Sequence, residues 1–368
     1  MKKIFQVLFI LFQGLQSLAQ STHPWERPLI ICNSIDGINF SSCSLFQDSS
    51  GVPSLALDSS GRILCAFQWF PEPFQGLHWD SVAVKISMDT GLTWSEPEAI
   101  VIQNFPANFQ RPFDPTLVAL PGGQIRIYFS SGPPGMNTIG TYSAIGTDGI
   151  HYTFEPGVRF SQTGRNCIDP AVNFFQGLFH YTSPKGAPQD GAFHAVSNDG
   201  LTFTQLADIS SDAQHNWTGN MLVDSLALKF YGTGNSSMWF SSTGDGNTWS
   251  PYRALNIAGG DPAVVKTFHR GYIIVYTGPP LSTEIENQVT DRSIYVYPNP
   301  AKNKIYLSVP NPLSNQDYSI MDLSGKVILS GSLSTTVSEL VLNNPPLGIY
   351  IIRIFYHDKI YYKRFCVM

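Results

Sequence analysis

Three aspartates share a sequence context that would suit acid–base chemistry. Asp114, Asp169 and Asp261 are each followed by proline and then by mostly apolar residues, as at the start of a β-strand. Proline fixes the backbone before the ladder of a sheet begins, so each carboxylate would point in a reproducible direction. Two carboxylates about 5–10 Å apart can hydrolyse a glycosidic bond, because one protonates the leaving oxygen while the other attacks or activates water. Close like charges also raise the pKa of one of them, as an acid requires.

Other polar and aromatic residues near these positions are candidates for substrate binding. Arg111 and Arg165 precede Asp114 and Asp169 by three and four residues, and Arg165 is expected to lower the pKa of Asp169 and keep it ionised. A second set could stack on or border a sugar: His215, Trp217 and Trp69. Each candidate has a structural alternative, because an aspartate before proline can cap a turn or pair with a nearby arginine, and an aromatic side chain can pack in the core. Glu155 is expected in a surface turn.

Two kinds of hairpin alternate along the chain and would position these residues. The first kind has an apolar strand, a turn rich in Gly, Asp or Ser, and an aromatic-rich strand, and begins at residues 52, 114, 169, 221 and 261. The second kind is marked by an Asp–Gly turn, at Asp36, Asp89, Asp148, Asp199 and Asp245. Spacings of 53, 59, 51 and 46 residues between successive turns are typical of a β-propeller, whose innermost strands line a central axis. The strand starts would then converge on an axial pit.

The Asp–Gly turns resemble the Asp-box of sialidase-like propellers, S-x-D-x-G-x-T-W. Residues 87–94 fit this motif fully, "STGDGNTW" from Ser242 shifts the aspartate by one place, and the other three turns are looser matches. In such a turn the Asp and hydroxyl side chains bond backbone amides, while glycine takes a positive φ. In that family the boxes lie at the periphery, away from the active site. The resemblance therefore implies a fold and not an activity.

The order of the hairpins predicts how the two ends of the first domain meet. The hairpin that begins at residue 261 has no Asp–Gly hairpin after it, whereas the one around Asp36 has no partner before it. We therefore expect residues 28–46 to complete the sheet that begins at residue 261. This would close a five-bladed β-propeller over residues 20–278 and leave no exposed sheet edge. The alternative is a six-bladed sialidase fold with one unrecognised blade.

The N-terminus predicts export. Residues 1–19 contain two lysines, a short apolar run and a small-x-small site, which is typical of a cleaved signal peptide. In an oxidising compartment an odd count of five cysteines leaves at least one unpaired. Cys32 and Cys43 flank the first Asp–Gly turn and are candidates for a disulfide. Cys65 and Cys167 are expected to behave as buried hydrophobic residues.

Composition argues against several classes of function. Charged residues make up 13% of the chain and the net charge is -5 with no basic run, so nucleic acid is not an expected partner. No stretch after the signal peptide is long and apolar enough to span a membrane. No CxxC or His-rich spacing indicates zinc, and no cofactor is expected.

A second domain is expected at the C-terminus. A polar linker at residues 279–293 precedes residues 294–368, whose alternation and turns are typical of a small Ig-like β-sandwich. The segments "YPNPAKNKI", "DLSGKV" and "LGIYIIRI" and the basic–aromatic end resemble the C-terminal sorting domain of the type IX secretion system of Bacteroidota. The resemblance implies contact with that secretion machinery and a location outside the cell or on its surface. The alternative is an ordinary accessory sandwich.

One further resemblance concerns the aspartates. "NCIDP", residues 166–170, is similar to a motif of five-bladed arabinanase-like glycosidases, and the match would give Asp169 that family's orienting and pKa-tuning role. Two positions depart from the pattern. Residues 51–53, Gly-Val-Pro, stand where the family's base aspartate would be, and residues 215–220, "HNWTGN", stand where its acid glutamate would be. An arginine clamp of the sialidase kind is also incomplete, so sialic acid cleavage is not implied.

Two classes of function follow. The first is a carbohydrate-active enzyme, a glycosidase-type hydrolase, with Asp114, Asp169 and Asp261 as catalytic residues and a glycan as substrate. The second is a non-catalytic surface propeller that binds a glycan or a protein. The missing acid and base favour the second class, whereas secretion by a polymer-degrading lineage favours the first.

Overall fold

The chain forms two compact units, residues 1–281 and 282–368. The computed structural model describes residues 27–267, 270–279, 295–309, 316–322, 326–333, 335–343, 345–356 and 359–368. Apart from two short 3-10 turns, the elements in these ranges are β-strands, so the predicted all-β class is confirmed. The predicted signal peptide, residues 1–19, and most of the predicted linker lie outside the described residues. No helix within the described ranges is long and apolar enough to cross a membrane.

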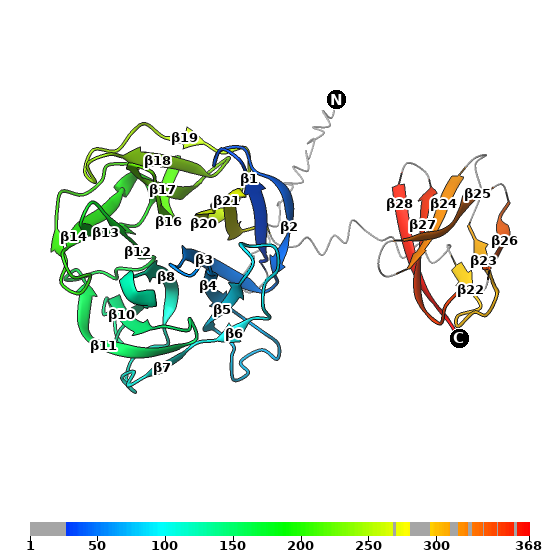
Figure 1. The fold of residues 1–368 in the computed structure, drawn as a ribbon, viewed down its shortest axis with the longest axis horizontal. Coiled ribbons are helices and arrows are strands. Elements are labelled where there is room, and N and C mark those ends of the chain that lie inside the picture. The colour runs from blue at the N-terminus through cyan, green and yellow to red at the C-terminus, as the bar shows by residue number, and fades with distance from the viewer. Residues whose placement is uncertain are drawn as a thin grey trace, which may run out of the picture. The chain divides into compact units, whose positions relative to one another are not determined.

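The first unit contains five sheets in its described part, arranged around a common centre (Figure 1). The first sheet has β3 (Ser50–Leu57), β4 (Ile63–Trp69), β5 (Ser81–Ser87) and β6 (Glu98–Ala99). The second has β8 (Phe113–Ala119), β9 (Ile125–Ser131), β10 (Gly140–Gly146), β11 (His151–Phe160) and β7 (Val101–Gln103), which runs parallel to β11. The third has β12 (Ala171–Phe175), β13 (Leu178–Pro184), β14 (Ala192–Ser197) and β15 (Thr204–Gln205). The fourth has β16 (His215–Asp224), β17 (Ala227–Gly234), β18 (Trp239–Thr243) and β19 (Arg253–Ala254).

The fifth sheet joins the two ends of this unit. Its order is β2 (Ser41–Gln47), β1 (Leu29–Ser34), β21 (Gly271–Thr277) and β20 (Gly260–Thr267). Strand β1 pairs antiparallel with β21, from Leu29 opposite Thr277 to Ser34 opposite Tyr272. A disulfide joins Cys32 on β1 to Cys43 on β2. The N-terminal hairpin therefore pairs with the segment that the order of the hairpins predicted.

The inner strands lie nearest the centre in Figure 1: β3, β8, β12, β16 and β20. The second strand of each sheet is covered on both faces, because neighbouring sheets pack against it. Strand β9 is buried along its whole length, and β4 is buried up to Trp69. Such continuous burial explains why these strands are mostly apolar and do not alternate between apolar and polar residues. Cys65 and Cys167 are free and buried, as the sequence predicted.

The Asp–Gly turns are held by their own side chains. At the turn of residues 87–94, the amides of Leu92 and Thr93 donate to Asp89 Oδ1, and the Thr93 hydroxyl donates to Asp89 Oδ2. These hydrogen bonds, led by the one from the Thr93 hydroxyl, lower the pKa of Asp89 to about 2. The amides of the second and third residues after Asp36, Asp148, Asp199 and Asp245 donate to those carboxylates in the same way.

The glycine of each turn packs against the second strand of the preceding sheet. A Cβ on Gly246 would lie 2.1 Å from the imidazole of His180, and one on Gly91 would lie 2.3 Å from Ile273 Cδ1. Both glycines also have a positive φ, which favours glycine. Because Ile273 lies on β21, the contact at Gly91 connects the fifth sheet to the first.

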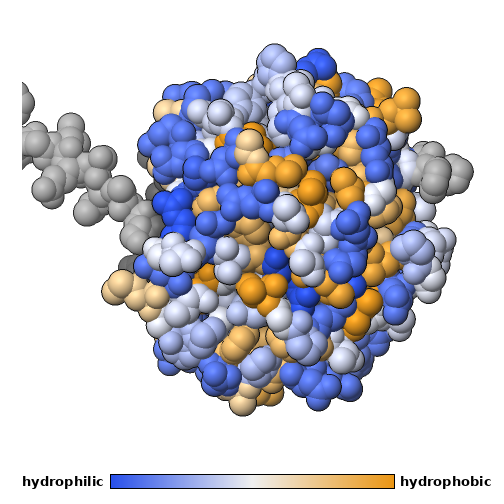
Figure 2. Space-filling view, turned by 90° about the vertical axis from the view of Figure 1, so that its left-hand side faces the viewer, coloured by the Kyte–Doolittle hydropathy of each residue, from blue (hydrophilic) through white to orange (hydrophobic). Residues whose placement is uncertain are grey.

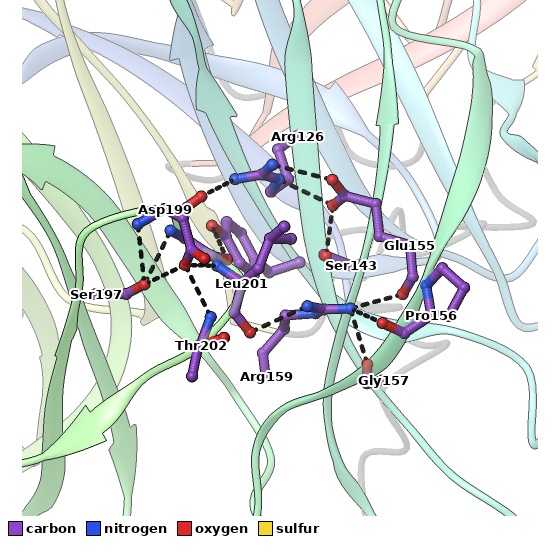
Figure 3. A network of polar contacts seen from close by, with 12 residues as sticks. Arg126, Ser143, Glu155, Pro156, Gly157, Arg159, Ser197, Asp199, Leu201 and Thr202 are labelled. Atoms are coloured by element: carbon purple, nitrogen blue, oxygen red, sulfur yellow. Dashed lines mark hydrogen bonds and ion pairs between the residues drawn. The ribbon is translucent and has the colours of Figure 1, made fainter.

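Polar contacts reinforce one of these junctions, between the second and third sheets (Figure 3). Arg126 on β9 makes a bidentate ion pair with Glu155 on β11, with both distances 2.9 Å, and also donates to the carbonyl of Asp199. The hydroxyl of Ser143 donates to Glu155 as well. The expectation that Glu155 lies in a surface turn is therefore wrong. Its carboxylate neutralises an arginine that the stacking of two sheets has buried.

The surface mixes polar and apolar residues. Figure 2 shows apolar atoms between polar ones over one face of this unit, in keeping with a chain of which only 13% is charged. Isolated apolar residues on a surface are ordinary in soluble domains.

The second unit is a small sandwich of two sheets. One has β22 (Tyr295–Tyr297), β23 (Lys304–Ser308) and β26 (Val337–Val341), and the other has β25 (Val327–Leu333), β24 (Gln316–Asp322), β27 (Gly348–Tyr356) and β28 (Lys359–Val367). Residues from both sheets form one core, which includes Ile305, Ile352 and Phe365. This arrangement agrees with the sandwich that the alternating sequence predicted.

Candidate functional site

The three Asp–Pro positions share an unusual backbone conformation. Asp114, Asp169 and Asp261 have φ values of 50°, 52° and 48°, in the left-handed region that L-residues seldom adopt. Aspartate tolerates this region better than most residues, because its short side chain can bond locally. In β8 and β20 the pairing register shifts across the aspartate and its proline, as at a β-bulge. The bulge and the positive φ together set where each carboxylate points.

The first and fourth sheets have the same irregularity without a carboxylate. Val52 has a φ of 48° and is followed by Pro53, and the register of β3 shifts at the same place. A β-branched residue at this φ is a strong outlier, which indicates that the surrounding structure imposes the conformation. In β16 the corresponding register shift lies between Asn216 and Gly219, so Trp217 and Thr218 are the residues inside it. Three of the five sheets therefore carry an acid at this place, and the first and fourth sheets do not.

Asp114 and Asp169 are in direct contact. The backbone N–H of Asp169 donates to Asp114 Oδ2 at 3.2 Å, and the Ser130 hydroxyl donates to the same oxygen at 3.1 Å. Burial raises the pKa of Asp114 to about 6. Burial, and then the charges of Asp114 and Asp261, raise the pKa of Asp169 well above its usual range, so the pair retains a proton at a pH where ordinary carboxyls have lost theirs.

Asp261 faces the same pair from the fifth sheet. Its charge raises the pKa of both other aspartates, which places the three carboxyls within electrostatic reach of one another. Burial raises the pKa of Asp261 too, but the hydroxyls of Thr218 and Thr277 and the charge of Arg27 oppose that shift. The Thr233 hydroxyl accepts from its backbone N–H at 2.9 Å. Asp261 is therefore better supplied with groups that stabilise its ionised form than Asp169 is.

A pocket of about 540 Å³ opens beside Asp114, and we call it the pit. It is lined by Gly51, Val52, Gln68, Phe70, Asp80, Gln110, Arg111, Phe113 and Asp114. Gln68 donates to Asp80 at 2.7 Å, which fixes two polar groups on its wall. The pit thus combines aromatic rings, amides, a guanidinium and acids, which is the mixture that sugars engage by stacking and hydrogen bonding.

The two arginines behave differently from one another. Arg111 lines the pit, and its Nη1 donates to the carbonyl of Trp79 at 2.6 Å. Arg165 donates to the carbonyl of Lys185 and lies over the ring of Phe193. Within the described residues, no ion pair joins either arginine to a carboxylate. The expectation that Arg165 lowers the pKa of Asp169 is wrong, because burial and two neighbouring carboxyls raise it.

The aromatic candidates are occupied by packing. Trp217 is 1% exposed and belongs to the core between the third and fourth sheets, so its ring offers no face to a ligand. His215 stacks on Tyr252 with ring centroids 4.0 Å apart, and its Nδ1 lies 2.7 Å from Asp212. Trp69 packs against the core of the first sheet. Successive strand residues point to opposite faces, so Trp69 points away from the pit that Gln68 and Phe70 line.

Several pit residues escaped the sequence analysis. Gln68 lies in the otherwise apolar run "ILCAFQW", and a single polar residue in a buried strand was the available signal. Asp80 and Gln110 lie in segments with no repeat pattern. Outside the pit lining, Ser130 and Thr277 lie near the ends of strands whose apolar residues dominated the pattern, so their contacts with the aspartates emerge only from the folded geometry.

Several solved structures are distantly similar to the chain. A putative glycoside hydrolase from Parabacteroides distasonis is 11% identical with a TM-score of 0.45, covering 63% of this chain and 87% of that one. A family 117 glycoside hydrolase from Zobellia galactanivorans is 13% identical with a TM-score of 0.46, covering 59% and 73%. An endo-arabinase from Bacteroides thetaiotaomicron is 15% identical with a TM-score of 0.45, covering 63% and 90%. No curated protein sequence matches the chain.

The C-terminal unit has a clear family match. Residues 295–368 match the family model of the secretion system C-terminal sorting domain. This confirms the sorting domain that the C-terminal motifs predicted, and such a domain implies secretion to the outer surface.

Proposed function

We propose that the protein is an exported, five-bladed β-propeller that binds a glycan in the pit and hydrolyses it. Two observations support the closed ring: the pairing of β1 with β21, and the contact of Gly91 with Ile273. The observation that carries the activity is the convergence of Asp114, Asp169 and Asp261 with unequal proton affinities. Pairs of acids whose environments separate their pKa values are what acid–base hydrolysis requires.

The proposed roles follow from these contacts. Asp114 and Asp169 are too close for a sugar to lie between them, so they act as one proton-sharing acid that protonates the leaving oxygen. Asp261 serves as the base or nucleophile, because its hydroxyl partners and the charge of Arg27 oppose the rise that burial causes in its pKa. Ser130 holds Asp114 in place.

A glycan screen with matched variants tests this function. Plant, host and microbial polysaccharides are incubated with the full chain, and reducing ends are measured. Asp114→Asn and Asp261→Asn should each lower the rate at least about tenfold, since one charge-assisted hydrogen bond contributes about 1.5–3 kcal/mol. Asp212→Asn, at a surface carboxylate bonded to His215, is the control and should retain the wild-type rate. Equal rates in all four proteins would refute the catalytic role.

A second candidate function is glycan binding without cleavage. The absence of a carboxylate at Val52 and at residues 217–218 favours it, because two of the five sheets lack an acid at the start of the inner strand. In that case calorimetry would detect a bound oligosaccharide, no product would form, and the three aspartate variants would change affinity alone.

Export is tested separately. Removing residues 295–368 should leave the protein in the periplasm of its native host, because the signal for outer-membrane passage is lost. Fractionation with an antibody against the first unit measures this. Secretion at the wild-type level after truncation would contradict the proposed route.

A further inference from the structure

A second, smaller pocket adjoins the pit. It has a volume of about 150 Å³ and lies between β5 and the segment that leads from β6 to β8. Its walls are formed by Val82, Ile100, Ile102, Phe105 and Pro112, with Ser81 and Arg111 beside them. Five of these seven residues are apolar, in contrast to the amides and acids of the pit.

The walls of this side pocket are held in place by the fold. Ile100 N donates to the carbonyl of Val82 at 3.0 Å, which ties the segment to β5. Ile102 belongs to β7, which pairs with β11. Phe105 contacts the rings of Phe109, Phe129 and Phe154. A hollow with walls this well supported needs no rearrangement to accept a group, and preformed sites lose little free energy to ordering.

Arg111 forms a shared wall, because it lines both the side pocket and the pit. Its hydrogen bond to the carbonyl of Trp79 fixes the guanidinium at this boundary. A ligand whose sugar lies in the pit can therefore extend past Arg111 into the side pocket.

We infer that the glycan carries a benzene-sized apolar substituent, such as an aromatic acyl ester or an aryl aglycone, which occupies the side pocket. An apolar cavity of about 150 Å³ is large enough for benzene. A bare sugar would leave polar hydroxyls against Ile100, Ile102 and Phe105 without hydrogen-bond partners, which is unfavourable. This inference rests on the proposed function for the identity of the sugar, whereas the apolar site itself can be tested alone.

The first experiment measures the side pocket without a sugar. Benzyl alcohol is titrated into the full chain and followed by saturation-transfer NMR. The wild type should bind the probe, and Ile102→Trp, which fills the hollow, should weaken binding about tenfold. Val101→Trp is the matched control, because Val101 is exposed on the same strand and does not line the pocket. Ile100→Phe is a second filling variant in case Ile102→Trp does not fold.

The outcomes separate the two proposals. The side-pocket inference would be wrong if the wild type did not bind benzyl alcohol, or if Val101→Trp weakened binding as much as Ile102→Trp. A second arm compares benzyl and methyl glycosides of the sugar that the glycan screen identifies, because their leaving alcohols are about equally basic. Preference for the benzyl glycoside should vanish in Ile102→Trp, while Asp114→Asn should lower turnover of both glycosides alike. Probe binding without any glycan cleavage would contradict the proposed function and leave the apolar site standing.

Discussion

Two sets of aspartates occur in the first unit, one in the turns of all five sheets and the other at the strand starts of three, and their environments shift the carboxyl pKa in opposite directions. In the Asp–Gly turns, Asp89 receives hydrogen bonds from amides and a hydroxyl, which lower its pKa to about 2. At the strand starts, burial and then the charge of Asp261 raise the pKa of Asp114 to about 6. Donors that converge on an exposed carboxylate stabilise its charge, whereas burial beside like charges destabilises it. The first set is suited to holding the fold, and the second to exchanging protons.

Substitution of a turn glycine should have the largest effect on stability. Gly246→Ala places a methyl group 2.1 Å from the His180 ring, which is itself buried, and the positive φ adds strain. We expect a loss of about 3 kcal/mol in the free energy of unfolding, measured from the urea-induced unfolding transition of the first unit.

Gly61 provides the matched control. It also has a positive φ, but a Cβ there would meet nothing within 4 Å. Gly61→Ala should therefore lose only about 1 kcal/mol, from backbone strain alone. Equal losses in the two variants would show that the contact with His180 is not what requires glycine in the turn.

Removal of a titratable group at a strand start should affect function more than folding. Asp169→Asn keeps the side-chain shape and removes a group that burial disfavours when ionised, so the free energy of unfolding should change by no more than about 1–2 kcal/mol. Glycan cleavage or binding should fall at least about tenfold. Urea denaturation and the glycan assay measure the two effects on the same preparation. A large loss of stability with unchanged function would show that Asp169 has a structural role and no functional one.

Charge removal in a turn should have the opposite outcome. Asp89→Asn weakens the hydrogen bonds from Leu92 and Thr93, so the melting temperature should fall while glycan cleavage or binding keeps its wild-type value. A scanning calorimetry trace and the same glycan assay compare it with Asp169→Asn. Loss of activity at unchanged melting temperature would place this turn in the functional site.

The sequence predicted the parts of the molecule that repeat. Five Asp–Gly turns and five hairpins define the strands, and an unmatched hairpin at each end predicted that β1 pairs with β21. Local motifs of this kind can be recognised in the sequence because each copy needs the same residue types for the same hydrogen bonds. The three aspartates were also identified from sequence, by their shared Asp–Pro pattern.

What the sequence did not predict depends on contacts between distant segments. The pKa of Asp169 is raised by burial and then by the charges of Asp114 and Asp261, whereas Arg165, its neighbour in sequence, does not lower it. Whether an aromatic ring faces a pocket or the core depends on strand phase and on the adjacent sheet, which is why Trp217 proved to be buried. Gln68 and Asp80 became recognisable as pit residues only once the loop after β4 was placed.

The pH dependence of stability offers the finest distinction between the two sets. A carboxyl with a raised pKa binds its proton more tightly in the folded state, so Asp114 stabilises the protein fully below about pH 4 and loses that contribution as the pH rises towards about 6. Asp89 has a lowered pKa, so its contribution is present above about pH 4 and is lost as the pH falls towards about 2. His180 and His194, whose pKa values burial lowers, favour the folded state at higher pH and overlap with the Asp114 window.

Subtracting the wild-type dependence of the free energy of unfolding on pH from that of each variant removes the contribution of the two histidines. Asp114→Asn should abolish a contribution of about 1–2 kcal/mol that changes between pH 4 and 6, and should leave the region below pH 4 as in the wild type. Asp89→Asn should alter the pH dependence of the free energy of unfolding only below about pH 4. Urea denaturation at half-unit pH steps from 3 to 7 measures both curves. If the Asp114→Asn difference is flat across pH 4–6, the carboxyl titrates normally, and the contrast between turn and pit disappears together with the proton that the proposed acid would donate.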